Sequence, residues 1–253
     1  MKRGFIFDVD GVIADTPHEE AWRESLRFLF REKDTWKHLL RRTSYSPERF
    51  TPNLYREQIS GKTRIEGARS ALAYFHVPDP DELLLKEYCE TKQKVYLQKI
   101  AHGEFRVYDD AILLLLEAKR KGAKILAASS SKNAGLILDN ISMNEWQRTH
   151  NVQYDSIDAS TTLLRLFDGN VSGGHGRRSK PDPDIFLHAA ASGTLTPGDC
   201  LVIEDAPNGV QAAKRGHFFC VGIARANNER ELREANADIV TNDLRNILAE
   251  LLL

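Results

Sequence analysis

The chain has 253 residues, of which 42% are hydrophobic and 28% charged, and this composition excludes a disordered protein. A formal net charge of −1 gives no global attraction to nucleic acid or to an anionic membrane. No stretch reaches the roughly 18 apolar residues of a membrane-spanning helix, and three widely spaced cysteines are typical of reduced thiols. We therefore expect a cytoplasmic globular protein of one or two domains that binds neither nucleic acid nor membranes.

The first predicted element is a buried strand, Gly4–Phe7, which is followed by carboxylates at Asp8 and Asp10. Residues two apart on a strand point the same way, and Gly11 can turn the chain with a positive φ. Two close carboxylates suggest a divalent cation between them, or a nucleophile beside a general acid/base. A surface turn is the alternative. An EF-hand is excluded because Val12 stands where that loop needs Asp or Asn.

A long helical segment follows the first strand, from about Pro17 to Lys99. Within it, Ala21–Phe30 and Leu83–Ile100 carry apolar residues at helical spacing. The prolines that mark predicted loops are Pro47, Pro52, Pro78 and Pro80. We expect an inserted helical domain, residues 16–103, within a core domain formed by residues 1–15 and 104–253.

Beyond the insertion, strands alternate with helices. The predicted strands are Lys124–Ala128, Cys200–Ile203, Phe218–Ile223 and, with a weaker pattern, Ala237–Val240. The predicted helices are Asp110–Lys121, Asp182–Ala191 and Asn208–Arg215. This alternation predicts an α/β fold with a parallel sheet and helices on both faces, whose ligands bind beyond the carboxyl ends of the strands. Residues 145–179 show no clear pattern, and Gly173–Arg178 predicts a mobile loop.

Three further polar fragments stand near predicted strand ends. The hydroxyls and backbone N–H groups of Ser129–Asn133 suit a phosphate, or cap a helix. Lys180 precedes a proline at a helix start and is either a fixed positive charge or an ordinary surface lysine. Glu204 and Asp205 end another strand, and parallel pairing would bring them beside the first acidic pair as an oxygen cage for Mg²⁺. A capping acid is the alternative for this second pair.

Together and in this order, the four fragments resemble the motifs of the haloacid dehalogenase superfamily. The segments Ala128–Asn133, Lys180–Phe186 and Glu204–Ala213 are similar to those of its β-phosphoglucomutase-like branch. The resemblance implies a Rossmann-like core, and the inserted helical segment resembles the first cap type of that superfamily. In the insertion, His18 and Gly61–Arg64 are similar to cap residues of the branch.

The resemblance implies Mg²⁺-dependent phosphoryl transfer through an aspartyl-phosphate. Asp8 would be the nucleophile, and Asp10 the general acid/base. Ser129 would donate a hydrogen bond to a phosphoryl oxygen, and Lys180 would balance the negative charge. The implied metal ligands are Asp8, Asp10 through its carbonyl, Glu204 and Asp205. The implied substrate-binding residues are His18, Gly61, Arg64, Ser130, Ser131, Lys132 and Asn133.

The acceptor of the phosphoryl group distinguishes two activities. We expect a phosphatase acting on a sugar phosphate or another small phosphomonoester, as a monomer or weak homodimer. The alternative is a β-phosphoglucomutase-type isomerase, although Ser60 stands where mutases often have a lysine and the stretch from Ser129 to Lys180 is longer than usual. A dehalogenase fits less well, because that chemistry needs no Mg²⁺ and typically lacks the second aspartate of the first motif.

Overall fold

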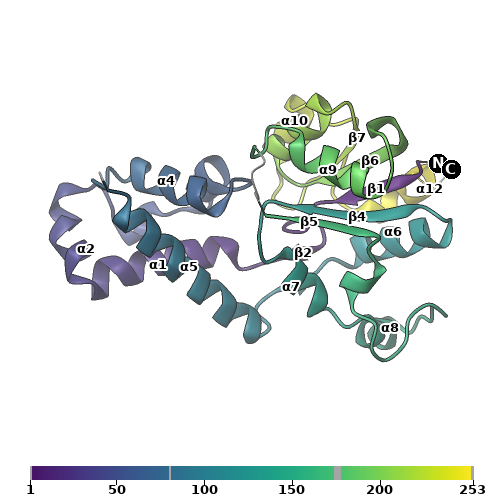
Figure 1. Ribbon diagram of the computed structural model, residues 1–253, viewed down its shortest axis with the longest axis horizontal. Coiled ribbons are helices and arrows are strands. Elements are labelled where there is room, and N and C mark those ends of the chain that lie inside the picture. The colour runs from purple at the N-terminus through teal and green to yellow at the C-terminus, as the bar shows by residue number, and fades with distance from the viewer. Residues whose placement is uncertain (1, 80, 174–177, 252–253) are drawn as a thin grey trace. The chain divides into compact units, whose positions relative to one another are not determined.

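The computed structural model describes residues 2–79, 81–173 and 178–251, and the chain forms two units (Figure 1). One unit contains the residues up to Asp15 and from Val107 onward, and the other is Thr16–Arg106. Where the chain passes between them, β2 (Ala14–Asp15) and β3 (Arg106–Val107) form a two-stranded sheet. Most of the predicted mobile loop at Gly173–Arg178, namely residues 174–177, lies outside the described residues.

The first unit is built on a six-stranded sheet in the order β5-β4-β1-β6-β7-β8, and all of its neighbouring strands are parallel. Its strands are β1 (Gly4–Phe7), β4 (Lys124–Ser129), β5 (Gly169–Ser172), β6 (Cys200–Glu204), β7 (Phe219–Ile223) and β8 (Ile239–Thr241). Phe5, Ile6 and Phe7 are fully buried, as expected for a central strand covered on both faces. The predicted Rossmann-like α/β fold class is confirmed.

Helices cover both faces of this sheet (Figure 1). On one face lie α6 (Asp109–Arg120) and α7 (Ala134–Asp139), and on the other α9 (Asp184–Ser192) and α10 (Pro207–Arg215). The sheet and the second pair of helices share an apolar core that includes Ile6, Phe186, Val202, Val210 and Phe218. The remaining helices of this unit are α8 (Met143–His150), α11 (Glu229–Glu234), α12 (Leu248–Leu251) and the short turns η4 (Leu163–Leu166), η5 (Pro197–Asp199) and η6 (Leu244–Ile247).

The segment without a clear sequence pattern contains regular structure. Helix α8 begins beside it, where the Ser142 side chain accepts a hydrogen bond from the Glu145 backbone N–H. Strand β5 lies within it and is the edge strand that the sequence did not predict. Val171 is the buried residue of β5, while Gly169 and Ser172 are half-buried and Asn170 is exposed. An edge strand with one buried residue carries too weak an apolar signal to be recognised.

Apart from Arg106 at its end, which belongs to β3, the regular structure of the second unit's described residues is helical. Its longer helices are α1 (His18–Glu32), α2 (Asp34–Leu39), α4 (Arg64–Tyr74) and α5 (Leu83–Ala101), and its short turns are η1 (Leu40–Arg42), η2 (Pro47–Arg49), α3 (Pro52–Leu54) and η3 (Tyr55–Ile59). Pro47 and Pro52 begin short helices, so the prediction that they mark loops was wrong. Proline has no N–H to lose at a first helical position, where that group has no partner within the helix. An aromatic core including Trp22, Trp36 and Tyr88 holds the unit together.

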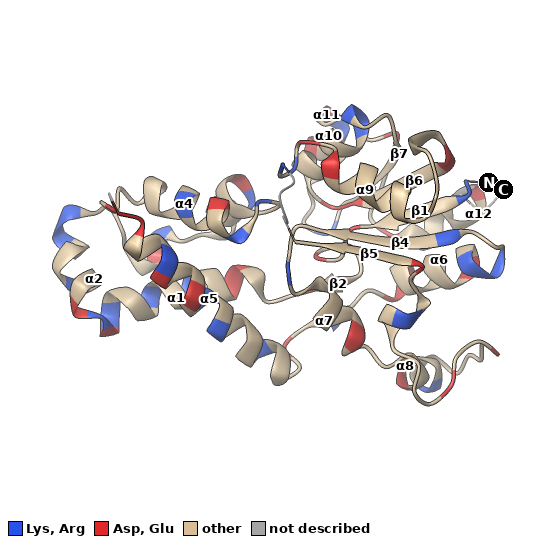
Figure 2. Cartoon of the chain, viewed as in Figure 1, with Lys and Arg blue, Asp and Glu red and all other residues tan. Residues whose placement is uncertain are grey.

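Charge is mixed over the surface of both units. In Figure 2, basic and acidic residues are interspersed along the helices, in keeping with the net charge of −1. Within the described part of the chain, no helix combines the length and the apolar character that crossing a membrane requires.

Candidate active site

Three neighbouring strands end side by side at one edge of the core sheet, and each end carries a polar residue. Strand β1 lies between β4 and β6 and is paired with both in parallel register. Asp8 follows the last residue of β1, while Ser129 ends β4 and Glu204 ends β6. The fold therefore brings together the strand ends that the sequence marked as candidates.

Lys180 joins two of these carboxylates. Its Nζ donates a hydrogen bond of 2.6 Å to Asp8 Oδ1 and another to Glu204 Oε1. Lys180 is only 6% exposed, and the centre of the Phe186 ring lies 5.0 Å from its Nζ. Because a lysine is buried only when its charge is compensated, these contacts exclude the alternative of an ordinary surface lysine.

Glu204 connects Lys180 to the turn after β6. Its Oε1 accepts the hydrogen bond from Lys180, and its Oε2 accepts from the backbone N–H groups of Asp205, at 3.0 Å, and Ala206, at 3.1 Å. A Cβ atom on Gly209 would lie 2.0 Å from this carboxylate, so α10 approaches it closely. These contacts favour an ion-pairing role for Glu204 over the metal-ligand role implied by the sequence.

Asp10 contacts the serine-rich loop after β4. Ser129 Oγ donates to Asp10 Oδ2 at 3.2 Å and accepts a hydrogen bond of 3.0 Å from the backbone N–H of Ser131. The backbone N–H of Asn133 in turn donates to Ser131 Oγ at 3.2 Å. Ser129 and Asn133 are buried, Ser130 and Ser131 are half-buried, and Lys132 is exposed. The loop therefore holds the Ser129 hydroxyl beside the second aspartate of the first motif.

Gly11 brings the turn after β1 against Asp205. Its φ is +85°, in the region that side chains other than glycine rarely adopt. A Cβ atom at this position would lie 2.1 Å from Asp205 Oδ2, so the space that any other residue needs is occupied by that carboxylate. The positive φ expected from the sequence is observed. Glycine at this position both turns the chain and lets the backbone approach the Asp205 carboxylate.

The cluster holds more carboxylates than its buried lysine can neutralise. Burial raises the pKa of Asp8 to about 8; Lys180 opposes this shift, and Glu204 and Asp10 add to it. Burial and the same acidic neighbours raise the pKa of Asp205 well above its ordinary value. Although burial alone would lower it, the pKa of Lys180 is raised by Asp8 and Glu204. Extra positive charge at this site would therefore be stabilising.

The donors suit a hard cation that keeps part of its water shell. Asp8 and Asp205 are carboxylates that approach the same turn, and the Asp10 carbonyl is a third oxygen donor nearby in sequence. Among residues 2–79, 81–173 and 178–251, no group of three His, Cys, Asp or Glu side chains forms a ready metal cage. Two carboxylates with water and substrate oxygens are the usual protein ligands of a small divalent cation that dehydrates reluctantly.

The predicted cap residues belong to the second unit. Lys92 Nζ donates a hydrogen bond of 2.6 Å to His18 Nδ1, and the Tyr96 ring stacks on the His18 ring. Since lysine can only donate, His18 Nδ1 is the acceptor and the ring proton lies on Nε2. Gly61 precedes α4 with a positive φ, and Arg64 is the first residue of that helix. The roles of His18, Gly61 and Arg64 toward a substrate stay predictions.

Two residues of the first unit that contact the candidate loops were not anticipated. Arg225 Nη2 lies 3.5 Å from the carbonyl oxygen of Val12, and Asn228 Nδ2 donates to the Asp205 carbonyl at 2.8 Å. Both lie in the loop after β7, which ends at the same edge of the sheet. Their position just beyond a predicted strand is the signal that could have found them.

A family model described as haloacid dehalogenase-like hydrolase matches residues 2–217. The chain belongs to this family. The β-phosphoglucomutase of Bacillus subtilis is 29% identical over 259 residues, covering 99% of this chain and 93% of that protein. The crystal structure of an archaeal β-phosphoglucomutase from Pyrococcus sp. strain ST 04 superposes with a TM-score of 0.68 at 28% identity, covering 98% of this chain and 96% of the other.

Two further relatives match over less of their length. Validoxylamine A 7′-phosphate phosphatase of Streptomyces hygroscopicus subsp. limoneus is 39% identical over 88 residues, which are 34% of this chain and 40% of that protein. Protein SUPPRESSOR OF QUENCHING 1 of Arabidopsis thaliana is 27% identical over 96% of this chain, which spans only 20% of that relative. The relatives of this haloacid dehalogenase-like chain therefore include both mutases and a phosphatase.

Proposed function

We propose that this haloacid dehalogenase-like hydrolase transfers a phosphoryl group from a sugar phosphate, or another small phosphomonoester, through an aspartyl-phosphate on Asp8. The observation that carries the proposal is the buried contact of Lys180 with Asp8 and Glu204, beside the Ser129–Asp10 hydrogen bond. A nucleophilic carboxylate and a phosphate are both anionic, so they approach each other only where fixed positive charge and hydrogen-bond donors balance them.

In the first half-reaction, an Asp8 carboxylate oxygen attacks phosphorus and the bond to the leaving oxygen breaks. Asp10 gives a proton to that oxygen, so the substrate leaves as an alcohol. Lys180 Nζ compensates the charge near Asp8, and the Ser129 hydroxyl donates to a phosphoryl oxygen. Fixed donors of this kind each lower the barrier by about 3–4 kcal/mol.

In the second half-reaction, Asp10 takes a proton from the acceptor, which attacks phosphorus and releases Asp8 as a carboxylate. With water as acceptor the product is inorganic phosphate, and with a second substrate hydroxyl it is an isomeric sugar phosphate. We favour water, since Ser60 replaces the lysine that mutases often carry. The role toward Asp10 that we propose for His18 comes from the resemblance; within the second unit, His18 Nδ1 lies 2.6 Å from Lys92 Nζ.

Mg²⁺ is the proposed cofactor. The Asp8 and Asp205 carboxylates and the Asp10 carbonyl would hold it, with Glu204 supporting the site through Lys180. When bound, the ion withdraws negative charge from the phosphoryl oxygens. The raised pKa values of Asp8 and Asp205 support this proposal, because a cation stabilises the ionised form of both carboxylates. A cytoplasmic location and a monomer or weak homodimer stay predictions from the sequence.

Phosphate release distinguishes the two activities. We expect inorganic phosphate from p-nitrophenyl phosphate and from at least one member of a sugar phosphate panel, with Mg²⁺ required and EDTA inhibiting. With β-glucose 1-phosphate and trace glucose 1,6-bisphosphate, a phosphatase releases phosphate in step with substrate loss. Formation of glucose 6-phosphate without matching phosphate would establish the mutase instead. Undiminished activity in EDTA would contradict the proposed cofactor.

Exchanging Gly11 for Ala tests the contact between the turn after β1 and Asp205. The added Cβ would displace the Asp205 carboxylate, and misplacement by about 1 Å can cost roughly 100-fold in kcat. Gly122→Ala is the matched control, because Gly122 has the same φ of +85° with no atom within 4 Å of an added Cβ. Both variants should lose about 1–2 kcal/mol of stability from left-handed strain, and only Gly11→Ala should lose activity. Equal activities in phosphate release assays would count against the close contact.

A further inference from the structure

The loop Ala224–Asn228 touches the backbone of two proposed catalytic loops. It follows β7, the strand next to β6, at the edge where Asp8 and Glu204 lie. Arg225 reaches the Val12 carbonyl at 3.5 Å, and Asn228 donates to the Asp205 carbonyl at 2.8 Å. One loop thus contacts the turn after β1 and the turn after β6, each of which carries carboxylates of the site.

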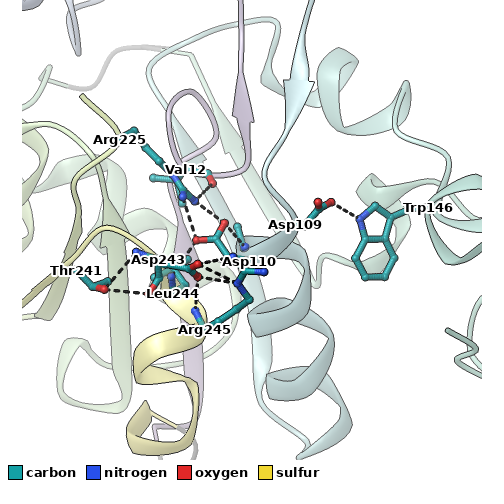
Figure 3. Close-up of polar contacts among 10 residues, drawn as sticks. Val12, Asp109, Asp110, Trp146, Arg225, Thr241, Asp243, Leu244 and Arg245 are labelled. Atoms are coloured by element: carbon teal, nitrogen blue, oxygen red, sulfur yellow. Dashed lines mark hydrogen bonds and ion pairs between the residues drawn. The ribbon is translucent and has the colours of Figure 1, made fainter. Parts of the chain in front are cut away.

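Arg225 is firmly held by the start of α6 (Figure 3). Its Nη1 and Nη2 donate to the two Asp110 oxygens at 2.9 and 2.7 Å, in the planar paired geometry that guanidinium and carboxylate groups share. Asp110 is buried and also accepts the backbone N–H groups of Ala111 at 3.0 Å and Leu244 at 2.9 Å. The Arg225 guanidinium also lies 3.9 Å from the centre of the Tyr108 ring.

These contacts connect Arg225 to the turn that carries Asp10. Val12 is two residues after Asp10, and the backbone N–H of Gly11 donates to the Ala14 carbonyl at 2.8 Å, which closes the turn. The backbone N–H of Tyr108 donates to the Ile13 carbonyl at 2.9 Å, directly after the contact at Val12. A shift of the guanidinium would therefore alter the backbone from which the Asp10 side chain extends.

We propose that Arg225 and Asn228 are positioning residues, which fix the loops of Asp10 and Asp205 respectively. The inference rests on the proposed function, since it assigns to Asp10 the protonation of the leaving oxygen and to Asp205 a metal contact. Neither residue needs to touch the substrate. Substituting Arg225 or Asn228 should change the positions of the Asp10 and Asp205 carboxylates. This effect on the site can be distinguished from a general loss of stability.

The Arg225 contact is tested by the dependence of rate on the leaving group. A displaced general acid matters most when the departing oxygen is strongly basic. We expect Arg225→Met to lower kcat/KM for phenyl phosphate about tenfold more than for p-nitrophenyl phosphate, whose leaving group needs less protonation. The matched control is Arg245→Met, which removes a largely exposed arginine that pairs with Asp243. It should change both rates equally or not at all.

The Asn228 contact is tested without catalysis. Asn228→Ala removes one hydrogen bond to the Asp205 carbonyl, a smaller change than loss of a buried charge pair, so this variant serves even if Arg225→Met does not fold. We expect the affinity of Asn228→Ala for Mg²⁺, measured by calorimetry on the whole protein, to fall at least about threefold. The affinity of Arg245→Met for Mg²⁺ should stay unchanged.

The results separate the two proposals. A selective loss on phenyl phosphate in Arg225→Met, or weaker Mg²⁺ binding in Asn228→Ala, supports the positioning role of the residue concerned. Equal losses on both substrates overturn the role of Arg225, and unchanged binding overturns that of Asn228. If the natural protein releases phosphate from neither compound, the proposed function fails on its own account, while the Mg²⁺ titration still decides the role of Asn228.

Discussion

Asp8→Asn should abolish turnover, with kcat lowered by at least about 10⁴-fold on any phosphomonoester that the natural protein hydrolyses. The amide has nearly the shape of the carboxylate but cannot form the phosphoryl ester, so the covalent route through residue 8 is lost. The neighbouring hydrogen bonds of Lys180 to Glu204 remain possible. The effect is therefore expected on chemistry rather than on folding.

Mass spectrometry of the acid-quenched reaction provides the direct measurement. The natural protein should carry one additional phosphoryl group during turnover, and Asp8→Asn should carry none. Asp199→Asn is a suitable control, because the half-buried Asp199 precedes β6 at the opposite end of the strand from Glu204. A phosphorylated Asp8→Asn protein, or one with full activity, would refute the nucleophile assignment.

We expect the stabilities of the natural protein and of Asp8→Asn, both in EDTA, to depend differently on pH. The pKa of Asp8 is raised from 3.8 to about 8, so between these values the folded state keeps a proton that the unfolded state has lost. This carboxyl therefore stabilises the metal-free fold fully below about pH 4, and the contribution disappears as the pH rises to about 8. Relative to Asp8→Asn, the natural protein should lose stability across this window in urea denaturation. A difference that grows with pH would contradict the raised pKa.

Lys180→Met should be the most destabilising substitution in the site. Removing one partner of a buried ion pair typically costs about 3–5 kcal/mol, because the other charge stays buried without compensation. Here two carboxylates, Asp8 and Glu204, would lose their shared cation. We also expect a loss of about 10²–10³-fold in kcat, the usual effect of removing a fixed group that balances developing negative charge.

Urea denaturation measures this loss against Lys37→Met. Lys37 pairs with Asp34 on a helix surface where both side chains are exposed, so its removal should cost no more than about 0.5 kcal/mol. Adding Glu204→Gln to Lys180→Met should restore part of the stability, since one uncompensated charge disappears. If Lys180→Met is as stable as Lys37→Met, the buried contact contributes little to the fold.

The sequence predicted the parts of the site that depend on strand ends. Apolar runs before Asp8, Ser129 and Glu204 located three central strands, and parallel pairing placed their carboxyl ends together. These signals are local, because a buried central strand is recognisable from a few consecutive apolar residues. The edge strand β5 lacks such a run, and it was missed.

Contacts between distant segments could not be predicted in this way. Asp110 looked like an acidic residue in the first turn of a helix, where it would normally be solvated. Its partner Arg225 is separated from it by most of the core domain, and nothing in the local sequence of either residue indicates the pairing. Glu204 was placed at the correct edge, but whether it faced a metal or Lys180 depended on side-chain geometry that spacing does not determine.

The contact between Gly11 and Asp205 has a consequence for how such a sequence can change. Position 11 can accept a side chain only if residue 205 gives up the space, and residue 205 is placed by a different strand far along the chain. A single substitution at either position would therefore impair the protein, whereas a simultaneous exchange at both positions would not. In a randomised library, we expect surviving variants at position 11 to be rare and to carry a second change at or beside position 205.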